Sequence, residues 1–431
     1  MDVKSILLNN SERIISIARY FAAALVPLVL NLITNPIVAS NMSPEDYAIV
    51  GYYRSYSSFV IPLVLFSVLN YYIKRFYEVQ DSEHDKLKAH IFKFLIFASI
   101  LLGFLAVIGI YVYTLIFNSD SQIPLFPYVW IAIMALPLNG VYALLLVDYK
   151  MERRSRIYVI VSIIFAVIKV WLLILFVVVL KWGAFGNLLS ILIANGVFFL
   201  ICCYLYRALF KIKVTLDGYR PIIRFCLPLA ASAMLVFFTN GYDRVCLEKL
   251  GEINELGFYV VAFSICSYLH MFSDAVGNTF QPDIYKSLAN RNLKQYFKFC
   301  AIVFFSEFMV VAMFVPLARP IANIITAGKY TESYHYMQIL AWSTLASSLY
   351  YAASEFTAAM GLTKITLYNK IFTSLASVVM YKLLIDNYRF IGAALGVSAS
   401  YLISVIGNLS FLFFSRKKLK CIWLNPPQTQ S

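Results

Sequence analysis

The stretch IYVIVSIIFAVIKVWLLILFVVVL, residues 157–180, is a long apolar run in which Lys169 is the only charged residue. An α-helix of about 20 apolar residues is long enough to cross the hydrocarbon core of a bilayer. Backbone groups in hydrocarbon have no water to bond, so a lone segment satisfies them by forming a helix. The stretch is therefore predicted to be a membrane helix with one charge near its middle.

The whole chain shares this apolar character. Its 431 residues are 61% hydrophobic and 13% charged, and the mean hydropathy is +0.75. A soluble domain carries about a quarter of its residues as charges, so this chain has too few to cover a soluble core. We predict an all-α integral membrane protein with twelve transmembrane helices. The predicted spans lie near 14–39, 48–72, 93–117, 126–147, 157–180, 187–206, 222–247, 255–280, 297–318, 336–360, 365–386 and 390–415.

Most of the 36 Lys and Arg residues fall in alternate loops. Because cytoplasmic loops are enriched in these residues, the pattern predicts a multi-pass protein with both termini in the cytoplasm. The net charge of +14 is spread over short loops, so it indicates topology and excludes a nucleic-acid partner. The first apolar run is too long for a cleaved signal peptide and is also predicted to be a membrane helix.

The sequence carries no motif for covalent chemistry or metal binding. Its seven Cys are scattered and its four His form no cluster, so neither a disulfide frame nor a metal site is predicted. It has no nucleotide-binding loop and no hydrolase motif. The longest loop, near 73–92, is short and polar. We therefore expect a protein that is not an enzyme and needs no cofactor.

Two helix starts in the sequence resemble each other. PEDYAIVGYYRSY (44–56) and INELGFYVVAFSI (253–265) each combine an acidic first turn, a small residue and an aromatic-rich run. Asp46 aligns with Glu255 at an offset of 209 residues. A repeat at a fixed offset is typical of a chain built from two copies of one unit.

A second pair of segments repeats at the same offset. KWGAFG (181–186) and RFIGAALG (389–396) each connect two predicted spans, and Gly183 aligns with Gly392. The match lies between the fifth and sixth spans of each half. The shared offset therefore predicts that the chain consists of two copies of a six-helix unit.

This repeat defines the predicted domains. Residues 1–210 would form an N-terminal six-helix bundle and residues 211–431 a C-terminal one. Because six is even, both halves enter the membrane in the same sense, and a pseudo-two-fold axis along the membrane normal relates them. Parallel halves of this kind are a transporter architecture, with the substrate path between them.

The features together resemble a known family. SPEDYAIVGYYRSY (43–56), YDRVCLEKLGEINELGFYVVAF (242–263) and FIGAALGVSASYLIS (390–404) resemble the Wzx-type polysaccharide flippases of the MOP (MATE-like) exporter superfamily. Asp243 and Arg244 match the Asp-Arg pair of that family. The resemblance covers the whole chain in length, number of spans and topology.

The resemblance implies two six-helix bundles around a central cavity. It implies transfer of an oligosaccharide repeat unit linked to undecaprenyl diphosphate, from the cytoplasmic to the periplasmic leaflet of a bacterial inner membrane. The process would be O-antigen, lipopolysaccharide or capsule assembly. The implied partners are the polyprenyl-diphosphate-linked glycan, membrane lipid and other membrane proteins of glycan assembly.

Lys169 is the basic residue predicted to lie deepest in the membrane, about 18 Å into its span. A charge at this depth is costly and marks a substrate path or a buried partner. One interpretation is a cavity cation that meets an anionic headgroup. The alternative, an ion pair across helices with Glu307, is equally open at this stage.

Arg54 lies on a polar helix about 9 Å from the outer face. Tyr53 and Tyr56 flank it, together with several serines, a composition typical of a helix that lines an aqueous cavity. We predict that these three residues bind substrate, the cation through the diphosphate and the rings through sugars. Arg19 is a further candidate, but a position about 8 Å from the inner face favours snorkelling to headgroups.

Asp243 and Arg244 lie near the outer end of the seventh span. Arg244 is a further candidate for binding the diphosphate. The depth of the pair favours a gate or an anchor at the helix end over a midplane substrate site.

Three more acids fall within spans, at Asp274, Glu307 and Glu355. A buried carboxylate can exchange a proton, so these residues and Asp243 are candidates for a gate or for coupling to a proton or sodium gradient. Structural ion pairing is the alternative. Two other functions stay open: a MATE-like multidrug or cation exporter, and a membrane enzyme of glycan assembly such as a polymerase or ligase.

Overall fold

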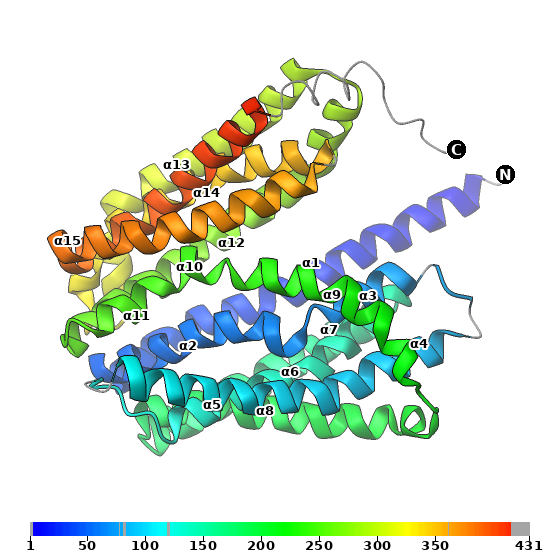
Figure 1. The fold of residues 1–431 in the computed structure, drawn as a ribbon, viewed down its shortest axis with the longest axis horizontal. Coiled ribbons are helices and arrows are strands. Elements are labelled where there is room, and N and C mark those ends of the chain that lie inside the picture. The colour runs from blue at the N-terminus through cyan, green and yellow to red at the C-terminus, as the bar shows by residue number, and fades with distance from the viewer. Residues whose placement is uncertain (1–2, 77, 81–82, 119–120, 361, 415–431) are drawn as a thin grey trace. The chain divides into compact units, whose positions relative to one another are not determined.

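The computed structural model describes residues 3–76, 78–80, 83–118, 121–360 and 362–414, and every element in them is helical. Figure 1 shows the course of the chain. The α-helices are α1 (Val3–Asn41), α2 (Pro44–Leu65), α3 (Val68–Phe76), α4 (His84–Lys93), α5 (Ser99–Phe117), α6 (Tyr128–Met151), α7 (Ser155–Leu173), α8 (Gly183–Leu205), α9 (Tyr219–Met234), α10 (Phe237–Asn240), α11 (Tyr242–Glu248), α12 (Ile253–Ala289), α13 (Leu293–Ile325), α14 (Tyr334–Ala359) and α15 (Thr363–Phe414). Short π-helical turns (Phe94–Ala98, Ile174–Val179) and 3₁₀ turns (Arg207–Lys211, Leu216–Gly218, Thr331–Ser333) connect or extend them.

The predicted all-α membrane class is confirmed. Within the described residues, eight helices are long and apolar enough to cross a membrane, or nine if α2 and α3, bent by 46°, form one span. α15 contains two predicted spans and is interrupted at Arg389, whose φ of 53° and ψ of −126° are not helical. The number of twelve spans remains a prediction.

The chain divides into two compact units. The first comprises Met1–Met234 with Ile325–Ala327, and the second Leu235–Ile324 with Gly328–Ser431. α9 belongs to the first unit because Ile222 and Cys226 are buried in its apolar core. The predicted division between residues 210 and 211 remains a prediction.

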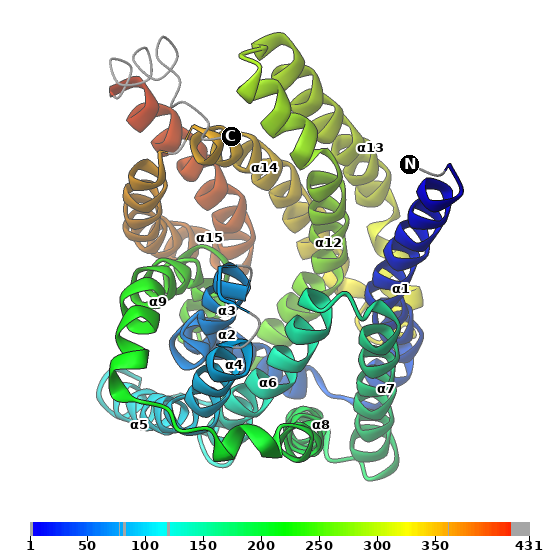
Figure 2. The ribbon, with the colours of Figure 1, turned by 90° about the vertical axis from the view of Figure 1, so that its right-hand side faces the viewer.

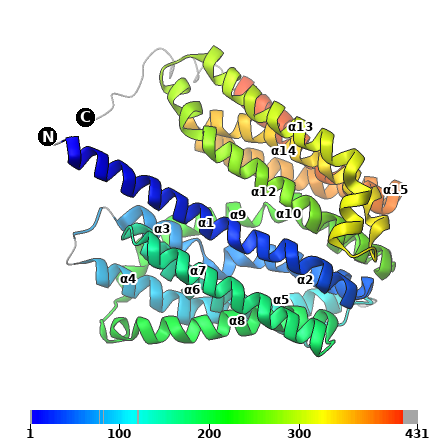
Figure 3. The ribbon, with the colours of Figure 1, turned by 180° about the vertical axis from the view of Figure 1, so that it is seen from behind.

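Each unit is a bundle of packed helices. In the first unit, α1 lies along α7, and α6 packs against α8 (Figures 2 and 3). In the second unit, α14 packs against both α12 and α15. The α1–α7, α6–α8 and α12–α14 contacts join helices that are not consecutive in the chain, which allows distant polar residues to share one cavity.

One carboxylate fastens the start of α2 to the start of α8. Asp46 and Ser43 form a capping box, in which each side chain accepts the backbone N–H of the other residue. The remaining oxygen, Asp46 Oδ1, accepts the N–H of Ala184 at 2.7 Å. Gly183 has a positive φ of 50°, and a Cβ there would overlap the Asp46 carboxylate. Glycine is thus required for this close approach.

The second unit also has side-chain contacts near 253–265 and 389–396, the segments that the repeat aligns with 44–56 and 181–186. Glu252 pairs with Arg389, and Glu255 accepts the hydroxyl of Tyr336. Arg389 and Lys181 both have a positive φ, 53° and 55° respectively, a conformation that only a few per cent of non-glycine residues adopt. Lys181 lies two residues before the Gly-Ala pair of its half, and Arg389 lies three residues before its own.

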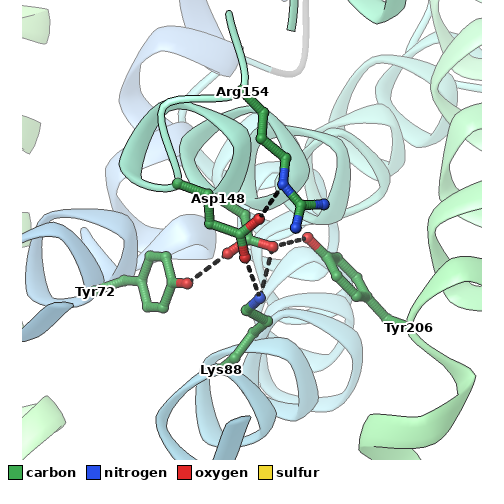
Figure 4. A network of polar contacts seen from close by, with 6 residues as sticks. Tyr72, Lys88, Asp148, Arg154 and Tyr206 are labelled. Atoms are coloured by element: carbon green, nitrogen blue, oxygen red, sulfur yellow. Dashed lines mark hydrogen bonds and ion pairs between the residues drawn. The ribbon is translucent and has the colours of Figure 1, made fainter. Parts of the chain in front are cut away.

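A buried ionic network closes one end of the first unit (Figure 4). Asp148 is 4% exposed and accepts three bonds: Tyr72 Oη at 2.6 Å, Lys88 Nζ at 2.7 Å and Tyr206 Oη at 2.9 Å. Glu152 also lies 3.4 Å from Lys88 Nζ. The network joins α3, α4 and α6 to the segment after α8, at the end predicted to be cytoplasmic.

Asp148→Asn should lower the free energy of unfolding by about 3–5 kcal/mol, because it leaves the Lys88 ammonium buried without its main partner. The measurement is denaturant unfolding of the purified protein in detergent micelles. The matched control is Asp217→Asn, since Asp217 has an exposed ion pair with Arg220 at 3.8 Å. Equal stability of the two variants would contradict the structural role of the network.

Gly183→Ala should destabilise the protein by about 1–3 kcal/mol, the scale of local backbone strain, because the added Cβ overlaps the Asp46 carboxylate. Gly109→Ala is the control, since a Cβ at Gly109 meets nothing within 4 Å. That change should be neutral or stabilise α5 by up to about 1 kcal/mol. Thermal unfolding in detergent compares them, and equal midpoints would rule out the steric account.

Candidate functional site

Two of the predicted cations line one cavity inside the first unit. The cavity has a volume of about 350 Å³ and receives Arg54 from α2 and Lys169 from α7. Its polar lining also includes Ser57, Asn139 and Asn195. The remaining lining residues are Ala132, Ala135, Leu136, Phe165, Leu188 and Ile191. Every charge on this wall is therefore positive.

The tyrosines around Arg54 orient α2. Tyr53 Oη donates to the carbonyl of Pro124 at 2.7 Å, and Tyr56 Oη lies 3.2 Å from Tyr52 Oη. All three rings are buried, whereas Arg54 is exposed. Neither Tyr53 nor Tyr56 is among the residues that line the cavity, so their expected contact with sugars remains a prediction. Their packing directs Arg54 towards the cavity.

Lys169 lies between two cavities. A second one, of about 280 Å³, is also inside the first unit and is lined by α1, α6 and α7. Asn31, Tyr142, Tyr158 and Ser162 contribute its polar groups, and Lys169 lines both spaces. In the described part of the chain, no hydrogen bond or ion pair engages the Lys169 ammonium. The cation is thus presented to cavity contents from two sides.

Arg19 lies away from this cluster. Its Nη1 donates to Ser155 Oγ at 3.4 Å, which links α1 to the first residue of α7. Ser155 belongs to the end predicted to face the cytoplasm. Arg19 therefore has a local partner near the expected headgroup level, and its role in substrate binding remains a prediction.

Asp243 and Arg244 form a buried network in the second unit. Asp243 is fully buried and accepts Tyr259 Oη at 2.6 Å. The Arg244 guanidinium lies 3.6 Å from the centre of the Phe263 ring, and its Nε is 3.9 Å from Asp243 Oδ2. Glu248 is also buried, at 4% exposure. Position along the helix predicted the depth of this pair but could not predict its burial, and the role as a gate remains a prediction.

The other candidate acids, Asp274, Glu307 and Glu355, all lie in the second unit. Glu307 is 1% exposed and accepts Ser273 Oγ at 2.7 Å. Glu355 accepts Gln281 Nε2 at 3.2 Å, whereas Asp274 is exposed. No three His, Cys, Asp or Glu side chains are grouped to hold a metal ion within the described residues. Their role in ion coupling remains a prediction.

Sequence reasoning missed the polar groups that surround Lys169. Ser162 lies about two turns before Lys169, and Tyr158 lies about three turns before it, so all three residues fall on one face of α7. That spacing was a signal in the sequence. Asn139 and Asn195 carry no such signal, because single amides in apolar helices are as often packed inside the bundle as exposed to a cavity.

Comparisons with known proteins identify the family and the fold. The profile of the family described as "Polysaccharide biosynthesis protein" matches residues 16–279. An uncharacterized membrane protein of Methanocaldococcus jannaschii is 26% identical over 260 residues, which are 56% of this chain. The match spans 61% of that relative, less than two thirds of its length.

Solved transporter structures share the fold. The lipid II flippase MurJ, in an inward closed conformation, superposes with a TM-score of 0.70 at 15% identity, over 96% of this chain and 94% of that one. An inward-facing multidrug resistance MATE transporter gives 0.67 at 16%, over 94% and 99%. A MOP superfamily transporter from Pyrococcus furiosus, whose binding pocket is described as having reverse polarity, gives 0.63 at 14%, over 94% and 96%.

Proposed function

The chain belongs to the polysaccharide biosynthesis protein family, and on this premise we propose that it flips a glycan lipid. The substrate is an oligosaccharide repeat unit linked to undecaprenyl diphosphate. The protein moves it from the cytoplasmic to the periplasmic leaflet of a bacterial inner membrane, for O-antigen or capsule assembly. No covalent step is required.

The observation that carries the proposal is the shared cavity of Arg54 and Lys169. Two like charges on one wall repel each other, and an anion between them removes that repulsion. Arginine binds phosphate oxygens in pairs, and lysine binds them as a point charge. A diphosphate satisfies both, which favours an anionic substrate over a cationic drug.

The uncharged part of the lining suits the rest of the substrate. Ser57 and Asn139 present a hydroxyl and an amide, groups that exchange hydrogen bonds with sugar hydroxyls. The polyprenyl tail needs no polar site, because hydrocarbon chains stay in the lipid. The cavity would thus hold the headgroup while the tail remains in the bilayer.

Transport would proceed by alternating access of two six-helix bundles related by a pseudo-two-fold axis, with both termini in the cytoplasm. Rigid-body rocking of repeats is the usual mechanism in such transporters. The shared offset of 209 residues between Asp46 and Glu255 and between Gly183 and Gly392 supports an internal repeat. Asp274, Glu307 and Glu355 would couple a proton or sodium gradient.

A MATE-like exporter is the second candidate function. Glu307, buried in the second unit with Ser273 as a hydrogen-bond donor, is the observation that favours it. A buried carboxylate suits a cationic cargo or a coupling ion. The two candidates differ in what accumulates when the protein is lost.

Lys169→Met and Arg54→Met should each reduce glycan delivery to the cell surface by about tenfold or more, the loss expected from removing one hydrogen bond to a charged group. The measurement is surface glycan in a deletion strain of the host that expresses each variant at equal protein levels. Lipid-linked oligosaccharide should accumulate on the cytoplasmic side. Arg156→Met, an exposed position on α7, is the control and should restore delivery.

Full delivery by both variants would contradict the cationic site. Normal surface glycan in the deletion strain, together with increased sensitivity to cationic drugs, would support the exporter instead.

A further inference from the structure

The second unit contains a polar cavity that no sequence prediction identified. It has a volume of about 180 Å³ and lies among α10, α14 and α15. Lys370 provides its only charged lining group, and Asn240, Tyr350, Thr373 and Tyr401 provide uncharged polar ones. The remaining lining residues are Leu235, Val236, Thr239, Ser374 and Ser404.

Two donors in this cavity are available to a ligand. In the described part of the chain, no hydrogen bond or ion pair engages the Lys370 ammonium. Thr373 is 3% exposed, and its buried hydroxyl has no hydrogen-bond partner there. Ser374 differs, because its hydroxyl already donates to the carbonyls of Lys370 and Leu235. Buried polar groups normally have partners, so Lys370 and Thr373 together mark a site that takes an acceptor.

The cavity has a counterpart in the first unit. Asn31 lines the cavity beside Lys169, and Asn240 lines the cavity beside Lys370. These two asparagines are separated by 209 residues, the offset of the predicted repeat. Lys169 and Lys370 lie on the fifth and eleventh predicted spans, which the repeat pairs, but they are 201 residues apart and so stand about two turns from alignment. Each unit nevertheless surrounds one lysine with an amide, tyrosines and hydroxyls.

We propose that the Lys370 cavity is a second oxyanion site, which binds a phosphate or diphosphate group. A lysine with hydroxyl and amide donors binds phosphate as a point charge. At roughly 30 Å³ per water molecule, the cavity has room for about six, enough for a phosphate group and too little for an oligosaccharide. That it receives the diphosphate of the transported lipid rests on the proposed function; the binding of oxyanions does not.

Titration of the purified full-length protein in detergent tests the proposal. The probes are inorganic pyrophosphate and farnesyl diphosphate, followed by calorimetry. The native chain should bind two equivalents of diphosphate, and Lys370→Met and Lys169→Met one each. Lys370→Arg keeps the charge and should retain two. The control is Lys382→Met, an exposed lysine on the same helix, which should also retain two.

The two probes distinguish the sources of the anion. Binding of two equivalents of pyrophosphate would show that the phosphate groups are sufficient for recognition. Binding of two equivalents of farnesyl diphosphate, with no binding of pyrophosphate, would show that both sites require a lipid headgroup. Both results support the proposal. A Lys370→Met variant that melts normally and binds as many equivalents as the native chain would overturn it. The difference between the native chain and Lys370→Met does not depend on binding at Lys169, so its absence leaves the proposed function standing, and failure of glycan delivery leaves the Lys370 site standing.

Discussion

An ammonium group in the middle of an apolar membrane helix constrains everything around it. Placing a lysine there costs about 2.5–3.5 kcal/mol on insertion scales, and Lys169 has no protein partner in the described residues to offset this cost. The first unit accommodates it with two adjoining cavities, of about 350 and 280 Å³. Polar residues of α1, α2, α6 and α8 line those cavities. Because the charged lining residues, Arg54 and Lys169, are both positive, we propose an anionic headgroup as the occupant.

Carboxylates hold this arrangement at both ends of the first unit. Asp46 joins α2 to α8 at one end, through a capping box and the N–H of Ala184. Asp148 joins α3, α4 and α6 to the chain after α8 at the other, with Lys88 as its main ionic partner. Buried ion pairs with several hydrogen bonds specify geometry more than they add stability. Asp46 therefore fixes α2, the helix that carries Arg54, against α8, and Asp148 fixes α6, which lines the same cavity.

Sequence patterns predicted the class of fold, the charges within apolar spans and the offset of 209 residues, because apolar length, charge position and repeat spacing are all read along the chain. They could not predict that Arg54 and Lys169 share a cavity, which depends on how α6 and α8 each pack against both α2 and α7. They missed Lys370, because a lysine a few residues inside a helix end usually snorkels to the interface. They placed Asp243 near the outer end of its span but could not predict that it is fully buried, since distance along a helix measures depth and not burial.

The most direct test of the central claim is transbilayer movement in proteoliposomes that contain the purified protein. A fluorescent oligosaccharide linked to a polyprenyl diphosphate is placed in both leaflets, and a membrane-impermeant reductant destroys the fluorophores that reach the outside. The account predicts that native protein exposes the inner pool, whereas Lys169→Met leaves it protected. A protected inner pool with native protein, or equal rates for both proteins, would contradict it.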